Sequence, residues 1–219
     1  MNEFEKKRGH VRDLVIAYVI LIFVGLVTYK ALDMLFSVHS YFVGHIAGFV
    51  GTGVAIYLLK EKYPLDLLTK IKSRHIFTYI LPAVFIDLLC ASFPYFIWLG
   101  HLETIPKEYN LFVSFSLIEN FFFLSYLCLL GPIIEEIFYR GFLYRIIRDK
   151  YAVFWGLIVS TGLFYLAHGI DNWTIIISSL IFTYVYEKSG NIWNNIIVHS
   201  LTNILWFIFL YWGIKYHLG

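Results

Sequence analysis

The chain has 219 residues, of which 59% are hydrophobic and 15% are charged, and its formal net charge is +2. Soluble domains are about half apolar and about a quarter charged, and a globule of this size could not bury so much apolar surface. This composition excludes an ordinary soluble domain, and we predict an all-α polytopic membrane protein. The basic residues do not form a stripe on a soluble face, so no nucleic-acid partner is expected.

Seven apolar stretches reach or approach the ~20 residues that a transmembrane helix needs. In chain order they are 13–36, 41–59, 76–99, 111–147, 152–169, 172–187 and 191–214. The sixth stretch is short, and the fourth is long enough to project beyond the hydrocarbon. We therefore predict a bundle of about seven transmembrane helices.

Lys and Arg side chains are unevenly distributed between the predicted connections. They gather in the N-terminal segment, in the connection at 60–75 and in the connection around 145–150. Cytoplasmic connections of membrane proteins carry an excess of Lys and Arg. With seven helices these basic segments all fall on one side, so we predict that the N-terminus is cytoplasmic.

Two features of the N-terminal half are expected to shape the bundle. In the segment 62–75, apolar residues recur at helical spacing among Lys and Arg, which predicts a short amphipathic helix on the cytoplasmic membrane surface. The second predicted helix contains Gly44, Gly48, Gly51 and Gly53. Small residues at such spacing allow helices to pack closely.

Ionisable side chains within the predicted spans are candidates for function, because they are costly to hold inside a membrane. Asp87 lies deep in the third predicted helix, where we expect it to make a hydrogen bond to another helix. The main candidates fall in the C-terminal half of the chain and are Glu135, Glu136, Arg140, His168 and His199.

The two adjacent glutamates in this half are expected to differ in role. Glu136 and Arg140 are four residues apart, so they share one helix face in the order that suits an ion pair. Such a pair explains Glu136 structurally. One residue turns a helix by ~100°, so Glu135 points away from Arg140 and towards another helix.

Glu135 has candidate partners on the helices that follow it. The chain reverses near residue 150, which places Glu135 and His168 at similar depths in an antiparallel helix pair. On the last predicted helix, His199 and Asn203 are four residues apart and share one face. We therefore predict that these four side chains line one polar cavity within the membrane.

Three short motifs in this region resemble those of a known family. They are EEIFYR at 135–140, FYLAH at 164–168 and HSLTN at 199–203. They are similar to the E-E-x-x-x-R, F-x-x-x-H and H-x-x-x-N/D motifs of the CPBP family, the CAAX-protease and bacteriocin-processing membrane proteins, which is also called the Abi family. The resemblance covers roughly residues 111–210.

This resemblance implies an intramembrane endopeptidase that acts on a membrane-associated peptide or protein. Glu135 is then the general base, and His168 helps to orient or deprotonate the attacking water. His199 and Asn203 are suited to donate hydrogen bonds to the oxyanion. The residues expected to support the site or to bind substrate are Glu136, Arg140 and Phe164.

The resemblance also predicts how the chain is organised and where it acts. Transmembrane helices at 1–110 precede a catalytic core of four transmembrane helices at 111–214. The chain resembles the small bacterial members, which are linked to bacteriocin self-immunity, pheromone processing and surface-protein regulation. We therefore expect it in the bacterial plasma membrane, with the lipid bilayer and a membrane peptide or protein as partners. Prenylated CAAX substrates are not expected.

Three alternatives stay open. The preferred mechanism needs no cofactor, but two histidines and a glutamate are also a zinc ligand set, so Glu135, His168 and His199 could hold zinc. Without catalysis, the chain would be a bacteriocin self-immunity protein that acts by binding. An ion-coupled transporter would use Glu135 and Asp87, but the chain lacks the repeat symmetry that is common in transporters.

Overall fold

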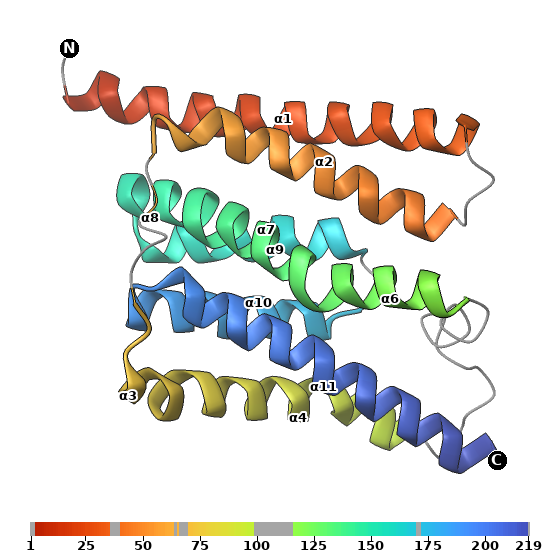
Figure 1. The fold of residues 1–219 in the computed structure, drawn as a ribbon. Coiled ribbons are helices and arrows are strands. Elements are labelled where there is room, and N and C mark those ends of the chain that lie inside the picture. Colours follow the sequence, from red (N-terminus) through yellow and green to blue (C-terminus); the bar gives the residue numbers. More distant parts are fainter. Residues whose placement is uncertain are drawn as a thin grey trace. The chain divides into compact units, whose positions relative to one another are not determined.

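A computed structural model describes residues 3–35, 40–63, 65, 70–98, 116–169 and 172–218 (Figure 1). Within these residues all regular structure is helical, as predicted. Several elements follow one another without a break, so the described residues form seven helical runs. In chain order the elements are α1 (Glu3–Leu35), α2 (Ser40–Lys60), α3 (Ser73–His75), η1 (Ile76–Ile80), α4 (Leu81–Trp98), α6 (Leu117–Ser125), η3 (Tyr126–Leu130), α7 (Gly131–Glu136), η4 (Ile137–Tyr144), α8 (Arg145–Tyr151), α9 (Val153–His168), α10 (Thr174–Ser189) and α11 (Ile192–Leu218).

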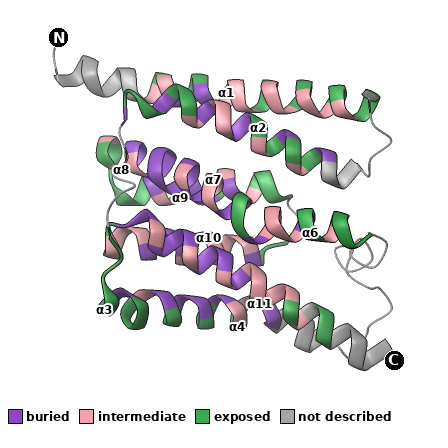
Figure 2. Cartoon of the chain, viewed as in Figure 1, coloured by how far each residue is buried: buried purple, intermediate pink, exposed green. Residues whose placement is uncertain are grey.

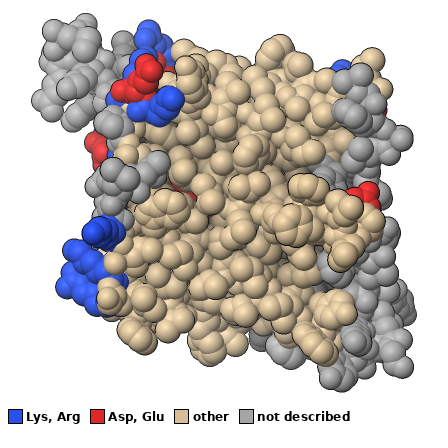
Figure 3. Space-filling view, viewed as in Figure 1, with Lys and Arg blue, Asp and Glu red and all other residues tan. Residues whose placement is uncertain are grey.

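In the part of the chain that the structure describes, five helices are long and apolar enough to cross a membrane. Their spans are Val11–Met34, Val43–Lys60, Ser73–Ser92, Leu117–Tyr151 and Ile192–Phe209. On the face shown in Figure 3, almost all acidic and basic side chains lie near helix ends, and the stretches between them carry neither. The chain is therefore a multi-pass membrane protein, as its composition predicts.

Internal contacts divide the chain into two units, which are described separately below. The first unit contains Met1–Thr69 and Ile133–Phe164, and the second contains Lys70–Pro132 and Tyr165–Gly219. The borders therefore fall inside the Leu117–Tyr151 helix and inside α9. The division into 1–110 and 111–214 follows motif content rather than contacts, and it stays a prediction.

In the first unit, α1 and α2 run side by side (Figure 1). Gly51 explains one point of close approach, because a Cβ atom there would lie 2.5 Å from the backbone oxygen of Leu21. Among the described residues, nothing lies within 4 Å of the corresponding positions at Gly44, Gly48 and Gly53. The predicted close packing is thus confirmed at Gly51, and the other three glycines do not contribute to it.

The connection after α2 is attached to α1 and to the start of α8. The Tyr63 hydroxyl donates to Asp13 of α1 at 3.0 Å, and the Arg145 guanidinium donates to the Tyr63 backbone oxygen at 3.1 Å. Burial raises the pKa of the Tyr63 phenol, and the hydrogen bond to Asp13 raises it further, so this donor stays protonated. Leu65 packs against Gly141, where a Cβ atom would lie 2.8 Å from its Cδ1.

The predicted amphipathic helix at 62–75 is only partly covered by the described residues. Residues 61–63 form a turn, and Leu65 and Lys70–Lys72 are not helical. The helix begins at Ser73. Residue 64 and residues 66–69 lie outside the described residues, so a helix there stays a prediction.

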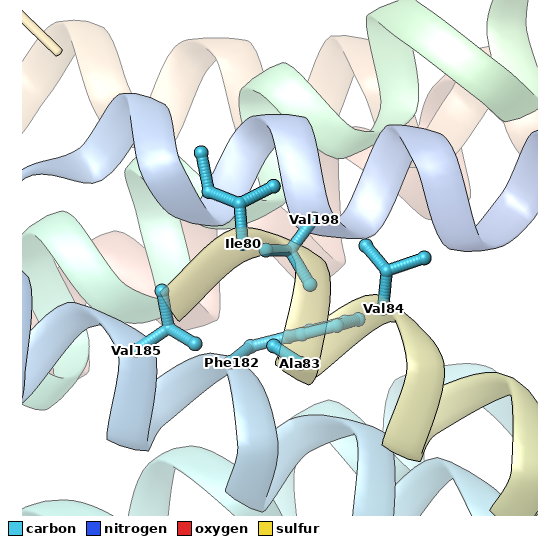
Figure 4. Close-up of a cluster of buried hydrophobic side chains, with 6 residues drawn as sticks. All are labelled: Ile80, Ala83, Val84, Phe182, Val185 and Val198. Atoms are coloured by element: carbon cyan, nitrogen blue, oxygen red, sulfur yellow. The ribbon is translucent and has the colours of Figure 1, made fainter. Parts of the chain in front are cut away.

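The second unit is built around a cluster of buried side chains from η1, α4, α10 and α11 (Figure 4). Its members are Ile80, Ala83, Val84, Phe182, Val185 and Val198. Asp87 lies on α4 and is fully buried, and its Oδ1 accepts a hydrogen bond of 2.6 Å from the Ser178 hydroxyl of α10. This contact confirms the predicted hydrogen bond between helices.

Among the described residues, three helical segments are wound as wider π-helical turns. Two of them directly precede a proline: Ile76–Ile80 precedes Pro82, and Tyr126–Leu130 precedes Pro132. Proline lacks an N–H group and its ring clashes with the carbonyl four residues earlier, so a wider turn relieves the clash. The third segment, Ile137–Tyr144, has no proline near it and contains Arg140. Such turns are frequent at functional sites.

Candidate active site

The centre of the first unit is an ion pair within a single helix. Arg140 Nη1 donates to Glu136 Oε1 at 3.0 Å, and both side chains are 0% exposed. The pair predicted from the four-residue spacing is therefore confirmed. Two opposite charges in a dry interior hold one another, and removing one of them leaves the other buried without compensation.

Aromatic side chains fix the position of the arginine. The Arg140 guanidinium carbon lies 4.5 Å from the centre of the Phe164 ring, which is a cation–π distance. Tyr139 packs edge-on against the other side of this cluster, with its ring centre 5.0 Å from that of Phe164. The Ser160 hydroxyl of α9 donates to the Tyr139 backbone oxygen at 3.1 Å, which ties α9 to the motif helix.

Figure 2 shows that purple, buried residues dominate the ribbon around α7 and α8. All residues from Phe138 to Tyr144 are buried. Glu135 is only half-buried, whereas the next residue, Glu136, is completely buried. The two adjacent glutamates therefore have different surroundings, as the helical phase predicts.

In the second unit, an aromatic ring holds His199 in place. The imidazole is 6% exposed and stacks on Phe182, with ring centres 4.7 Å apart and an interplanar angle of 26°. Phe182 is fixed in turn by Asn195, whose side-chain amide donates to the Phe182 backbone oxygen at 2.6 Å. Asn195 lies one turn before His199 on α11. Sequence reasoning missed this contact, although the four-residue spacing of the two polar residues was visible.

Asn203 makes a hydrogen bond that follows from a proline. Its Nδ2 donates to the Leu127 backbone oxygen at 2.8 Å. In a π-helical turn a carbonyl accepts from the N–H five residues later, and the residue five positions after Leu127 is Pro132, which has no N–H. Asn203 therefore supplies the missing donor. An amide carries two N–H groups, so this bond leaves one for another acceptor.

A second polar contact near the start of α11 was also missed. Asn194 is fully buried, and its Nδ2 lies 2.9 Å from Nδ1 of His75. Asn191 caps the helix, because its Oδ1 accepts a hydrogen bond from the Trp193 backbone N–H at 2.9 Å. These asparagines, together with Asn195, give α11 a polar N-terminal half within the membrane protein.

The structure places the predicted site residues in both units. Glu135 belongs to the first unit, whereas His168, His199 and Asn203 belong to the second. His168 is the last residue of α9 and is exposed. Each unit is defined by itself, so the convergence of these four side chains on one cavity stays a prediction.

The predicted zinc ligands are divided in the same way. Within each unit, no group of three His, Cys, Asp or Glu side chains among the described residues is close enough to hold a metal ion. Zinc held by Glu135, His168 and His199 therefore stays an open alternative to the metal-free mechanism.

Comparison with known proteins gives two matches for the C-terminal half. Residues 117–205 match the family described as type II CAAX prenyl endopeptidase Rce1-like. The chain is also 34% identical over 76 residues to the UPF0177 protein YxdF of Lactococcus lactis subsp. lactis (strain IL1403). That alignment covers 33% of this chain and 41% of the relative, so the chain spans well under half of its length. No solved structure matches the chain at a significant level.

The matched family segment includes all the residues that the three motifs contribute. It begins at the first residue of α6 and ends shortly after Asn203. At family level the match supports a CAAX-type intramembrane protease. Residues 117–205 are therefore similar to the Rce1-like family of CAAX endopeptidases, in the region where the three motifs lie.

Proposed function

We propose that this chain is an intramembrane endopeptidase that hydrolyses a peptide bond of a membrane-associated peptide or protein. The observation that carries this proposal is the family match, because residues 117–205 contain all three motifs. The buried pair of Glu136 and Arg140 supports it. Ionisable residues inside a membrane are costly and commonly mark functional sites, and this pair lies beside the half-buried Glu135 carboxylate.

In the proposed mechanism, Glu135 accepts a proton from a water molecule, and the water oxygen attacks the carbonyl carbon of the peptide bond. His168 helps to orient that water. As the new C–O bond forms, the carbonyl electrons move to the carbonyl oxygen. His199 and Asn203 then donate hydrogen bonds to this oxyanion.

The second half of the reaction breaks the C–N bond. The electrons of the oxyanion re-form the carbonyl, and the amine leaves. The amine takes the proton that Glu135 accepted, either directly or through His168. The products are a carboxylic acid and an amine, and the site returns to its starting state.

Glu136, Arg140 and Phe164 have a supporting role in this proposal. The ion pair and the ring under the guanidinium hold the motif helix in one orientation. Proton transfer needs a contact of about 2.6–3.2 Å or one intervening water, so the base must be held in place by its own helix. The proposal requires Glu135 and His199 to reach the same peptide bond, Glu135 through the attacking water and His199 through the carbonyl oxygen.

The substrate is proposed to be an unprenylated membrane peptide or protein of the bacterial plasma membrane. The resemblance to small bacterial family members supports this choice. The alternative is an immunity protein that protects the cell by binding alone. The two functions differ in whether protection requires the Glu135 carboxylate.

The test is a comparison of membrane peptides from cells that carry the wild type, Glu135→Gln or Glu61→Gln. Glu61 is exposed after α2, so its substitution is the matched carboxylate-to-amide control. We expect at least one membrane peptide to be shortened in cells with the wild type or Glu61→Gln, and to stay intact with Glu135→Gln. The amount of folded protein in the membrane is measured for each variant.

The peptidase proposal is refuted if Glu135→Gln folds and its cells contain the same membrane peptides as wild-type cells. Bacteriocin protection that persists in the same Glu135→Gln cells would then assign the chain to the binding class.

A further inference from the structure

The first unit contains an apolar groove outside the candidate site. It lies between α1, the η4–α8 helix and α9, and its volume is about 570 Å³. The residues that line it are Val11, Leu14, Val15, Leu143, Ile147, Tyr151, Trp155, Val159 and Leu163. All nine belong to the first unit.

The groove has a buried floor and an exposed rim. Leu14, Leu143 and Ile147 are buried and form the floor, whereas Val15 and Trp155 are more than half exposed. The volume falls within the range of about 300–1,000 Å³ that is typical of small-molecule sites. It is therefore suited to a flexible hydrocarbon chain rather than to a packed helix.

A positive charge lies at one end of this groove. The Lys150 ammonium is 4.9 Å from the centre of the Tyr151 ring, and Tyr151 lines the groove. Among the residues that the structure describes, no carboxylate forms an ion pair with Lys150. Arg12, beside Val11, lies 4.0 Å from the Asp13 carboxylate, so Lys150 is the cation that the groove offers.

The charged end is also the end of the membrane-spanning helices. Val11 begins the first candidate span and Tyr151 ends the fourth. Figure 1 shows the start of α1 and α8 at the same end of the first unit. Val159 and Leu163 lie one and two turns further along α9 from Trp155, so the groove extends from the charged end into the apolar part of the unit.

We infer that this groove binds an acyl chain of an anionic membrane phospholipid, with the lipid phosphate beside Lys150. An apolar channel that ends at a cation is complementary to a molecule with a hydrocarbon tail and an anionic head. A multi-pass membrane protein meets such molecules on every side. This site does not depend on the proposed peptidase activity.

Binding stabilises the first unit, because the lipid contacts the floor residues only when the helices are packed. Leu143 is three residues after Arg140 on the same helix, so the lipid covers the segment that follows the ion pair. The expected readout is therefore the thermal stability of the whole protein.

The experiment uses the full chain purified in detergent and titrated with phosphatidylglycerol or phosphatidylcholine with identical acyl chains. We expect phosphatidylglycerol to raise Tm at about five-fold lower concentration, because one basic residue near a membrane surface contributes about 1 kcal/mol to anionic-lipid binding. Glycerol 3-phosphate, which has the head without the chains, should not raise Tm. A rise in Tm with glycerol 3-phosphate would show that the site binds free phosphates, and it would contradict lipid binding.

Two kinds of variant test the contact with the lipid headgroup and the contact with the acyl chain separately. Lys150→Gln should abolish the preference for phosphatidylglycerol and keep the response to both lipids. Val15→Trp fills the rim and should abolish both responses. Val27→Trp is the matched control, because Val27 is also exposed on α1 and does not line the groove. It should behave as the wild type.

An unchanged lipid preference in Lys150→Gln, or an unchanged response in Val15→Trp, would overturn the inference. Val159→Phe fills the groove from α9 and replaces Val15→Trp if that variant does not fold. A second copy of the chain is the other molecule that could fill the groove, and light scattering on the same samples tests this. If Val15→Trp converts a dimer to a monomer, the groove is a contact between two copies and not a lipid site.

Discussion

At the scale of single residues, the most informative contrast is between two neighbours. Glu136 is completely buried and forms an ion pair of 3.0 Å with Arg140, whereas Glu135 is half-buried. Helical phase alone separates their environments, because one residue turns a helix by about 100°. Glu136 therefore forms the structural ion pair, and Glu135 is the general base of the proposed mechanism.

This contrast predicts opposite effects for the same chemical change. Glu136→Gln should lower the stability by about 3–5 kcal/mol, because it leaves the Arg140 charge buried without a counter-charge. Glu135→Gln should leave the folded amount within error of the wild type. Size-exclusion chromatography and thermal unfolding of the purified variants measure both. Equal stability of Glu136→Gln and the wild type would show that the pair does not hold the helix.

A second prediction at this scale concerns the orientation of His199. Asn195→Ala removes the hydrogen bond that fixes Phe182, which stacks on the imidazole. We expect kcat to fall by about ten-fold or more with little change in KM, since a lost buried hydrogen bond is worth about 1–3 kcal/mol.

Asn194→Ala is the control for this change. Asn194 is equally buried on the same helix but contacts His75 rather than Phe182. It should lower the stability and leave kcat as it is. If both variants lose kcat to the same degree, the effect of Asn195 is structural and not specific to His199.

At the scale of elements, small departures from the regular helix decide where polar groups meet. The π-helical turn before Pro132 leaves the Leu127 carbonyl without its helical donor, and Asn203 supplies one. The π-helical segment at 137–144 has no proline to explain it and contains Arg140. The helix that carries the EEIFYR motif therefore has π-helical turns both before and after its two glutamates.

The packing of α1 on α2 gives a prediction with an internal control. Gly51→Ala should destabilise the protein by about 1–3 kcal/mol, because the new methyl group would lie 2.5 Å from the Leu21 backbone oxygen. Gly48→Ala meets open space among the described residues and should be neutral or slightly stabilising. Thermal unfolding compares the two. Equal losses would mean that the close approach at Gly51 does not limit the packing.

At the scale of the whole molecule, the fold class was predictable because the bilayer imposes it. About 20 apolar residues per span and an obligatory helical backbone leave few alternatives. The Glu136–Arg140 pair and the Asp87 hydrogen bond were also predictable, the first from local spacing and the second from the cost of a buried charge. The connection at 61–65 was not, because its contacts with Asp13, Arg145 and Gly141 depend on residues far apart in the sequence.

The site was predictable only in part, for the same reason. Motif spacing identifies the residues on each helix, and the family match supports the choice. The contact of Asn195 with Phe182 and that of Asn203 with Leu127 join different helices, and no local periodicity reports them. The meeting of Glu135 with His168, His199 and Asn203 stays a prediction, because it joins the two units.

The central claim is that Glu135 and His199 act on the same peptide bond, Glu135 by activating the water and His199 by stabilising the oxyanion. A kinetic double-substitution experiment tests it most directly. The purified chain is placed in lipid vesicles with the peptide identified from cells, and its cleavage rate is measured for Glu135→Gln, His199→Gln and the double variant. Residues that act as a unit have strongly non-additive effects. We predict that each single variant lowers kcat by about 10³-fold or more and that the double variant is no slower than the slower single one. A double variant whose loss is the product of the two single losses, or a folded Glu135→Gln that cleaves at the wild-type rate, would contradict the account.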